Sequence, residues 1–149
     1  MRIAQFLQDH HIRFESILHP PAFTAIRRAR FLHLPGQQVA KCVLLNGPSG
    51  YFVAVLPATR HIDAEKLAEL VGGPVRFADC DEIARVFGDC EWGVVAPFGT
   101  LYGLPTYLDE SLAGDEPIIL EGNYHFEAIR MACRDFEELE HPRRFKFAR

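Results

Sequence analysis

Val39-Ala40-Lys41-Cys42-Val43-Leu44-Leu45 is an apolar stretch that carries a single charge, on Lys41. An apolar run of this length predicts a largely buried strand. Burial of an ammonium group is costly unless the group is paired or its site opens to a ligand. Lys41 therefore either lines a pocket for an anionic or carbonyl-bearing ligand, or points to water from an edge strand, where lysines oppose aggregation.

The residues around this stretch predict a β-hairpin inside a mixed domain. Asn46-Gly47-Pro48-Ser49-Gly50 is a turn signal, and a second apolar strand follows over 51–56. Further strands are expected over 12–18, 75–77, 106–108 and 118–120, helices near 3–7, 24–34, 63–71, 79–86 and 134–139, an ambiguous element over 126–131, and a basic tail from 142. Strands mixed irregularly with short helices predict an α+β domain around a curled sheet.

Length and composition indicate one domain, residues 1–149, with 48% hydrophobic and 24% charged residues. The net charge of −4 argues against generic, charge-driven binding of nucleic acid. The four cysteines form no CxxC motif, and the N-terminus shows no signal peptide, so we expect reduced thiols in a cytoplasmic protein. No apolar run approaches the length of a membrane span, so no membrane partner is expected.

A second candidate element is the loop Gly93-Val94-Val95-Ala96-Pro97-Phe98-Gly99. Glycines at its ends allow a ligand to approach the main chain closely. Backbone N–H groups there could hold the oxygen of an ester as it becomes an oxyanion. A plain turn packed by its own apolar side chains explains the same residues.

The histidines and Cys42 are further candidate catalytic groups. The seven histidines form no HxH or HxxxH pair, so neither a metal nor another cofactor is expected. His125 could position an attacking water or a ribose, or could be structural. Thr59 and His61 follow the second strand and are expected at the pocket mouth, whereas Asp63 is more simply a helix cap. Cys42 is expected to face the core, opposite to its neighbour Lys41.

Basic residues gather in two segments. Arg27, Arg28 and Arg30 lie on one short predicted helix, and further arginines and a lysine lie in the tail from 142. The helix is the candidate contact for the phosphates of a nucleic acid, and the alternative for both segments is a solvated face.

These residues, in this order, resemble the YbaK and prolyl-tRNA synthetase editing-domain family over roughly residues 12–139. The matching positions are His19, Pro20, Thr24, Ala25, Lys41, Pro57, Asp63, Leu67, Gly93, Pro97, Gly99, Asp109, Leu112, Gly122 and His125. The resemblance implies a curled, barrel-like mixed sheet of about six to seven strands flanked by short helices. Two segments depart from the common pattern: Cys42 stands where many members have asparagine, and Glu121-Gly122-Asn123-Tyr124-His125 differs near the end.

The resemblance also implies a function, a free-standing hydrolase that deacylates mischarged aminoacyl-tRNA carrying a small amino acid of the alanine, serine or threonine type. We expect Lys41, the Gly93 backbone and His125 to serve catalysis. The residues expected around the substrate are Thr24, Thr59, His61, Val95, Pro97, Phe98 and Gly99. Partners would be aminoacyl-tRNA and an aminoacyl-tRNA synthetase. The alternatives are a non-catalytic module that binds the same ligand or a synthetase, and a hydrolase of small esters or nucleotides.

Overall fold

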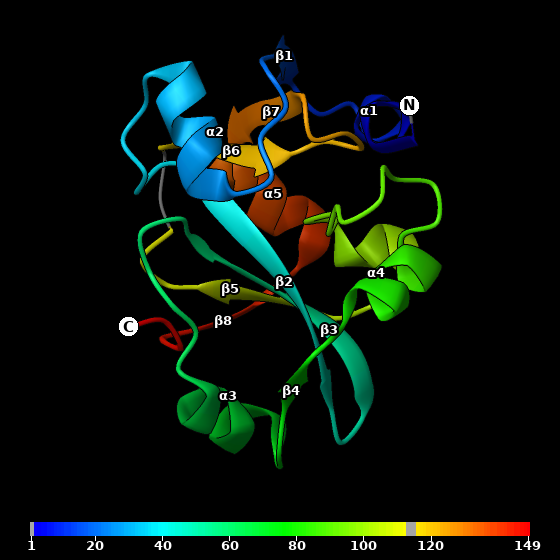
Figure 1. Ribbon diagram of the computed structural model, residues 1–149, viewed down its shortest axis with the longest axis vertical. Coiled ribbons are helices and arrows are strands. Elements are labelled where there is room, and N and C mark those ends of the chain that lie inside the picture. Colours follow the sequence, from blue (N-terminus) through cyan, green and yellow to red (C-terminus); the bar gives the residue numbers. More distant parts are fainter. Residues whose placement is uncertain (1, 113–115) are drawn as a thin grey trace.

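The predicted hairpin forms the centre of the larger of two sheets (Figure 1). In the computed structural model, which describes residues 2–112 and 116–149, β2 (Ala40–Gly47) pairs antiparallel with β3 (Gly50–Pro57), from Ala40 opposite Pro57 to Gly47 opposite Gly50. Gly50 turns the hairpin with a φ of 110°, a conformation that favours glycine. The sheet order is β4-β2-β3-β5-β8, where β4 is Arg76–Phe77, β5 is Thr106–Asp109 and β8 is Arg143–Phe145.

A second, three-stranded antiparallel sheet has the order β1-β7-β6. Its strands are β1 (Phe14–Leu18), β6 (Pro117–Glu121) and β7 (Glu127–Ala132), so the ambiguous segment near 126–131 is a strand. The expected α+β class is confirmed, but the expected single curled, barrel-like sheet of six to seven strands is not: the described residues form eight strands in two sheets and no closed barrel. Among residues 2–112 and 116–149, an isolated parallel bridge from Val39 to Ile119 is the strand pairing that links the two sheets, so no continuous ladder closes them.

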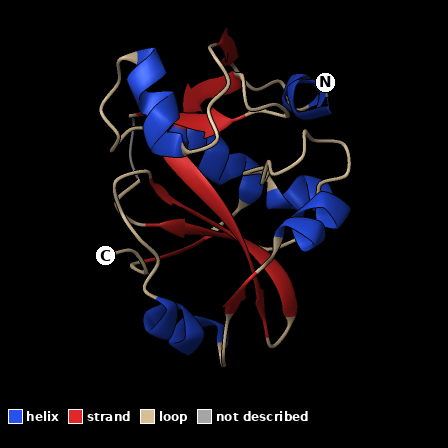
Figure 2. Ribbon diagram, viewed as in Figure 1, coloured by secondary structure: helices blue, strands red, loops and turns tan. Residues whose placement is uncertain are grey.

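The helices lie around these sheets (Figure 2), and three of them, α2, α3 and α4, begin at the predicted caps. They are α1 (Arg2–Asp9), α2 (Ala25–Leu32), α3 (Ala64–Val71), α4 (Cys80–Val86), α5 (Cys133–Glu140) and the 3₁₀ turn η1 (Gly99–Tyr102). The side chains of Thr24, Asp63 and Asp79 each accept a backbone N–H of the first helical turn. Glu82 completes a capping box with Asp79. Within the described parts of the chain, no helix has the length and apolar character needed to cross a membrane.

The main core lies between the two sheets and is closed by aromatic side chains. The Phe98 ring packs edge-on against Phe136 and Phe6, at centroid distances of 5.7 and 6.1 Å. Leu44 and Val55 reach the same cluster from β2 and β3. Burial of such side chains stabilises the fold by about 1.5–3 kcal/mol each. A second cluster, in which Phe52 and Leu56 pack with Leu67 and Phe147, covers the other face of the hairpin. The hairpin is therefore held on both faces, and a site has room only at its edge.

The basic side chains of the C-terminal segment are exposed, in agreement with a solvated face, but the backbone of the segment is part of the fold. β8 pairs in parallel with β5, and Ile62 forms a bridge with Ala148. Asp109, which is fully buried, accepts the N–H groups of Phe147 and Ala148 at 3.0 and 2.9 Å. Burial alone would raise the pKa of Asp109, but the hydrogen bonds from Ser111 and the C-terminal segment outweigh it, so the pKa lies below its usual value.

Replacement of Asp109 by alanine should therefore loosen the C-terminal segment. Asp109→Ala leaves buried N–H donors without an acceptor, which costs about 1–3 kcal/mol per group. We expect the free energy of unfolding, measured by urea denaturation, to fall by about 3 kcal/mol. The neighbouring exposed Glu110, changed to alanine as a control, should shift it by less than about 0.5 kcal/mol. Equal effects of the two substitutions would contradict this anchoring role.

Candidate functional site

A cavity of about 450 Å³ lies between α2, the start of β2 and the loop that contains Gly93. We call it the first cavity. Its lining combines apolar side chains with a few charged groups, which is the usual character of a ligand site. The lining residues are Phe23, Thr24, Ala25, Ile26, Arg28, Lys41, Cys42, Val43, Ala58, His61, Gly93, Val95, Glu121 and His125.

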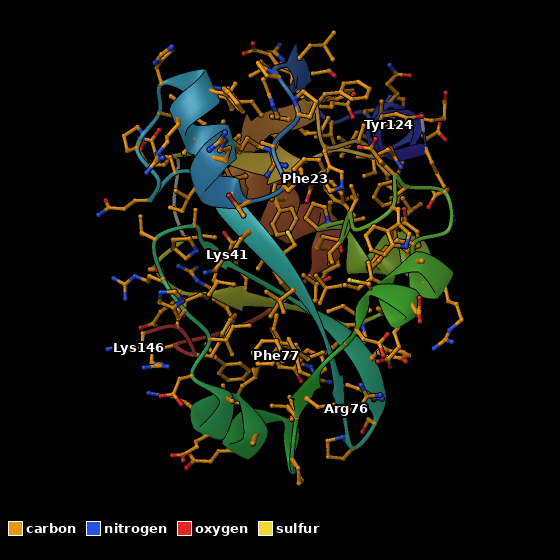
Figure 3. All side chains as sticks on the ribbon, viewed as in Figure 1. Phe23, Lys41, Arg76, Phe77, Tyr124 and Lys146 are labelled. Carbon is orange, nitrogen blue, oxygen red and sulfur yellow. The ribbon has the colours of Figure 1, made fainter. Side chains whose placement is uncertain are left out.

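Lys41 contributes an ammonium group to this cavity. Its side chain is partly buried, and burial lowers the pKa of its amine below the usual value. No carboxylate of the described residues lies within ion-pair distance of it. Lys41 lies on the face shown in Figure 3, below Phe23 in that view. A partly desolvated ammonium without a protein partner is suited to an anionic or carbonyl oxygen of a ligand.

Cys42 does not face only the core, as its alternation with Lys41 predicted, because both side chains line the first cavity. The reason lies in the edge of β2. β4 pairs with β2 only at Leu45 and Asn46, so the edge beside residues 41–43 is unpaired and consecutive residues border the opening. Burial, with a smaller contribution from Glu121, raises the pKa of the Cys42 thiol. A neutral thiol is a poor nucleophile, which agrees with the expected non-catalytic role.

A buried charge cluster forms the wall opposite to Lys41. The Glu121 carboxylate, at the end of β6, lies 3.0 Å from the Arg28 guanidinium and 3.2 Å from Nδ1 of His125. The Arg28 side chain is only 2% exposed and also donates to the Ala22 carbonyl at 3.4 Å. Because a buried charge is tolerated only when it is paired, the cluster fixes three chain segments around the cavity.

His125 is held by contacts of its ring and of its main chain. Nε2 lies 2.8 Å from the carbonyl oxygen of Trp92, and the main-chain N–H of His125 donates to Glu91 at 2.8 Å. Nδ1 lies 3.2 Å from the Glu121 carboxylate, within ion-pair distance but without a hydrogen bond of good geometry. Interaction with Glu121 is the main cause that raises the pKa of His125, with a further contribution from the Trp92 carbonyl, while burial opposes them. These contacts fix the ring beside the loop before Gly93.

The segment that carries His125 is fixed by its neighbours. Glu127 is buried and accepts from Ser16 at 2.9 Å and from the N–H of Asn123 at 3.3 Å. A Cβ at Gly122 would lie 2.0 Å from Oε1 of Glu127, so this approach requires glycine. The Asn123 side chain in turn accepts the N–H of Ile3 at 3.1 Å. The departure from the common sequence pattern thus coincides with a segment that is packed tightly in this chain.

Gly93 brings bare backbone to the first cavity. Its φ is 89°, and a Cβ there would lie 3.5 Å from Nε2 of His125. Val94 N–H closes a turn onto Glu91, whereas the N–H groups of Gly93 and Val95 donate to no acceptor in the described protein. Unpaired N–H groups beside a cavity can stabilise negative charge on a ligand oxygen.

The rest of the glycine–proline loop does not line the first cavity. Pro97, Phe98 and Gly99 are buried in the core instead. A Cβ at Gly99 would lie 2.4 Å from Oγ1 of Thr106, and the Gly99 N–H donates to that oxygen at 3.2 Å. This glycine therefore serves packing, which corrects its expected place beside the substrate. Thr59 is exposed and lies outside the lining as well.

The other predicted residues separate into two groups. Thr24, His61 and Val95 line the first cavity, together with Lys41, Gly93 and His125. The expected basic patch on α2 is corrected at Arg28, which points inward to Glu121 and leaves only Arg27 and Arg30 exposed.

Phe23, Ile26 and Glu121 belong to the lining of the first cavity but were not predicted to do so. The spacing of residues in the sequence does not distinguish Phe23 or Ile26 from other apolar residues. Glu121 was named only as part of the segment 121–125, which differs from the common pattern of the family.

The described residues contain no group of three or more histidine, cysteine, aspartate or glutamate side chains that could hold a metal ion. The polar part of the cavity consists instead of Lys41, the charge cluster and free backbone N–H groups. This arrangement can bind and polarise an ester carbonyl.

Comparison with known proteins gives consistent results. Residues 19–139 match the aminoacyl-tRNA editing domain family. The proline–tRNA ligase of Fervidobacterium nodosum is 30% identical over 127 residues, which are 83% of this chain and 22% of the ligase. The ligase of Thermosipho africanus is 27% identical over 131 residues, with the same shares of the two chains. This chain thus spans about a fifth of the length of these relatives.

A solved structure has the same fold. It is described as a candidate trans-editing enzyme for prolyl tRNA synthetase, and it superposes with a TM-score of 0.87 at 24% identity, covering 99% of this chain and 95% of that one. At this identity the similarity establishes the fold alone.

The charge cluster predicts how His125 titrates. Its pKa is raised above its usual value, so the stability that its charge contributes is fully present below about pH 6.5 and is lost as the pH rises through the raised value. Glu121→Gln removes the negative charge and should lower the pKa of His125, measured by NMR titration of the ring protons. Glu65→Gln, an exposed carboxylate outside the first cavity, is the control and should leave that titration unchanged. An unaltered His125 titration in Glu121→Gln would contradict the pairing.

Proposed function

We propose that this chain, which belongs to the aminoacyl-tRNA editing domain family, hydrolyses the ester of mischarged aminoacyl-tRNA carrying a small amino acid. The observation that carries the proposal is the unpaired Lys41 ammonium in one cavity with the free N–H groups of Gly93 and Val95. Both are groups that stabilise an ester carbonyl as it gains negative charge. We infer that it acts in trans, on tRNA charged by a separate synthetase, as the description of the similar solved structure suggests for that protein.

In the proposed reaction, the oxygen of a water molecule attacks the ester carbonyl carbon. The carbonyl oxygen becomes an oxyanion held by the N–H groups of Gly93 and Val95, and Lys41 holds the adjacent phosphate or the same oxygen. The bond from the carbonyl carbon to the ribose oxygen then breaks. The water proton reaches the ribose oxygen, which leaves as a hydroxyl, so the products are a free amino acid and a free tRNA.

Proton transfer in this scheme does not use His125, whose Nε2 lies 2.8 Å from the Trp92 carbonyl oxygen and whose Nδ1 lies 3.2 Å from the Glu121 carboxylate. The neighbouring ribose hydroxyl of the substrate relays the proton from the attacking water. The protein thus contributes position and electrostatics rather than an acid–base pair. His125 is a positioning residue in this scheme, because it acts through the Trp92–Gly93 backbone.

The proposed specificity follows from what an apolar wall can discriminate. Val95, Ile26 and Cys42 border the first cavity beside the charged groups. One methylene is worth about 1–3 kcal/mol in such a wall, and an added hydroxyl is not strongly rejected. Small esters that differ by a hydroxyl should therefore both be accepted.

Lys41→Met should abolish most of the deacylation and leave the fold intact. Methionine keeps the apolar length of the side chain but removes the charge, and loss of one such group costs at least about 10²-fold in rate. We expect the melting temperature to change by less than about 3 °C. The exposed Lys66, changed to methionine, is the matched control and should keep the wild-type rate. Wild-type turnover in Lys41→Met would contradict the electrostatic role, and binding of charged tRNA without any turnover by the wild type would favour a non-catalytic module.

The substrate range is tested by comparing alanyl-, seryl-, threonyl- and prolyl-tRNA under one condition. We expect the alanyl and seryl esters to be hydrolysed at rates within about 10²-fold of each other. The prolyl ester should be hydrolysed more slowly than either. Fast hydrolysis of the prolyl ester with the small esters spared would show that the cavity does not select small side chains.

A further inference from the structure

A second cavity, of about 690 Å³, adjoins the first and shares Lys41, Val43 and His61 with it. We propose that this second cavity binds the single-stranded 3′ end of the RNA substrate, with a base stacked on Phe77. The inference rests on the proposed function for the identity of the ligand. It adds a binding surface that the catalytic scheme above does not use.

Phe77 supplies the apolar platform of the second cavity. It lies on the two-residue edge strand β4 and is 56% exposed. In Figure 3 Phe77 lies below Lys41 and Phe23 above it, on the same face of the molecule. Bases of single-stranded nucleic acid stack on exposed aromatic rings of this kind with little sequence preference.

Arg149 supplies a further cation to the lining of the second cavity, and its backbone is held in place. Its backbone exchanges two hydrogen bonds with His61, at 3.0 and 2.8 Å, and Asp109 anchors the two residues before it. The side chain is exposed and lines the second cavity together with Lys41. Two cations at the rim of an open cavity with an aromatic ring match a nucleotide with its flanking phosphates.

The carboxylates of the second cavity select among nucleotides. Asp63 and Glu65 line it, so its charge is balanced and it does not attract phosphate alone. A carboxylate accepts a hydrogen bond from the exocyclic amino group of cytosine or adenine, which uracil lacks. Oδ1 of Asp63 already accepts the Lys66 N–H at 3.2 Å, which leaves its second oxygen available. We therefore infer a preference for the amino-bearing bases of a C-C-A end.

Lys41 connects the two parts of the ligand. Because it borders both cavities, a strand that enters through the second cavity places its last phosphate at Lys41 and its terminal ester in the first cavity. The exposed aromatic ring and the catalytic groups then act on one continuous ligand. Neither cavity needs to move for this arrangement.

The test measures binding of an uncharged hairpin RNA with an unpaired C-C-A end to the full chain, by fluorescence anisotropy. Phe77→Ala should raise the dissociation constant about tenfold, whereas Phe77→Tyr should keep wild-type binding. Arg149→Ala should weaken binding and reduce the slope of its salt dependence by about one. Phe145→Ala, an aromatic on the opposite edge strand β8, and Lys146→Ala, a nearby exposed cation, are the matched controls and should have no effect.

Two further arms identify the ligand. Removal of the unpaired C-C-A end should abolish the difference between wild type and Phe77→Ala, and replacement of its bases by uracil should weaken wild-type binding. Equal affinities of wild type and Phe77→Ala for the C-C-A hairpin would overturn the proposal. Cytidine 5′-monophosphate that binds in a Phe77-dependent manner, while the hairpin does not, would overturn it in favour of a free-nucleotide site.

Because the RNA is uncharged, this test does not depend on ester hydrolysis. Failure of the deacylation assay with Phe77-dependent binding intact would reject the proposed reaction and leave the RNA site standing. Normal deacylation and wild-type RNA binding in Phe77→Ala would do the reverse.

Discussion

The Glu121 carboxylate, placed between the Arg28 guanidinium and the His125 ring, is the interaction on which the site depends. Arg28 belongs to α2, Glu121 to β6, and His125 to the loop before β7, so one carboxylate joins three segments distant in sequence. Removing one member of such a buried cluster leaves an uncompensated charge, which is strongly destabilising. The cluster therefore sets the distance between α2 and the Gly93 loop, and with it the width of the first cavity.

The same cluster explains why the two cations near the cavity have different roles. His125 lies between the Glu121 carboxylate and the Trp92 carbonyl, and these contacts hold its ring in place. Lys41 has no such partner in the described structure and lies between two cavities. A paired cation preserves geometry, whereas an unpaired one can gain its partner from a ligand. The protein thus keeps rigidity and reactivity on separate residues.

Sequence patterns predicted the local elements well, because hairpins and caps depend on neighbouring residues. The turn at Asn46–Gly50 and the capping box of Asp79 and Glu82 are examples. Patterns failed where a distant partner decides the outcome. The sequence predicts Arg28 as part of a basic helix face, but its side chain is buried because it pairs with Glu121, which is 93 residues away in the sequence. The sequence predicts that Gly99 contacts a ligand, but the close packing of Thr106 against its Cα is what requires a glycine there. The split into two sheets is also invisible locally, because it depends on how strands far apart in the sequence pair, and an isolated bridge between Val39 and Ile119 links the sheets.

The shortness of β4 links this fold to its site. β4 covers only Leu45 and Asn46 of β2, so the edge of β2 at residues 41–43 is left open by the sheet itself. An open edge normally invites pairing with another chain, and a lysine on it opposes such pairing. Here the two explanations considered for Lys41 are compatible, because the lysine of an unpaired edge is also the lysine of a cavity. A longer β4 would close that edge, separate Phe77 from Lys41, and remove the opening through which a strand of RNA could reach both cavities.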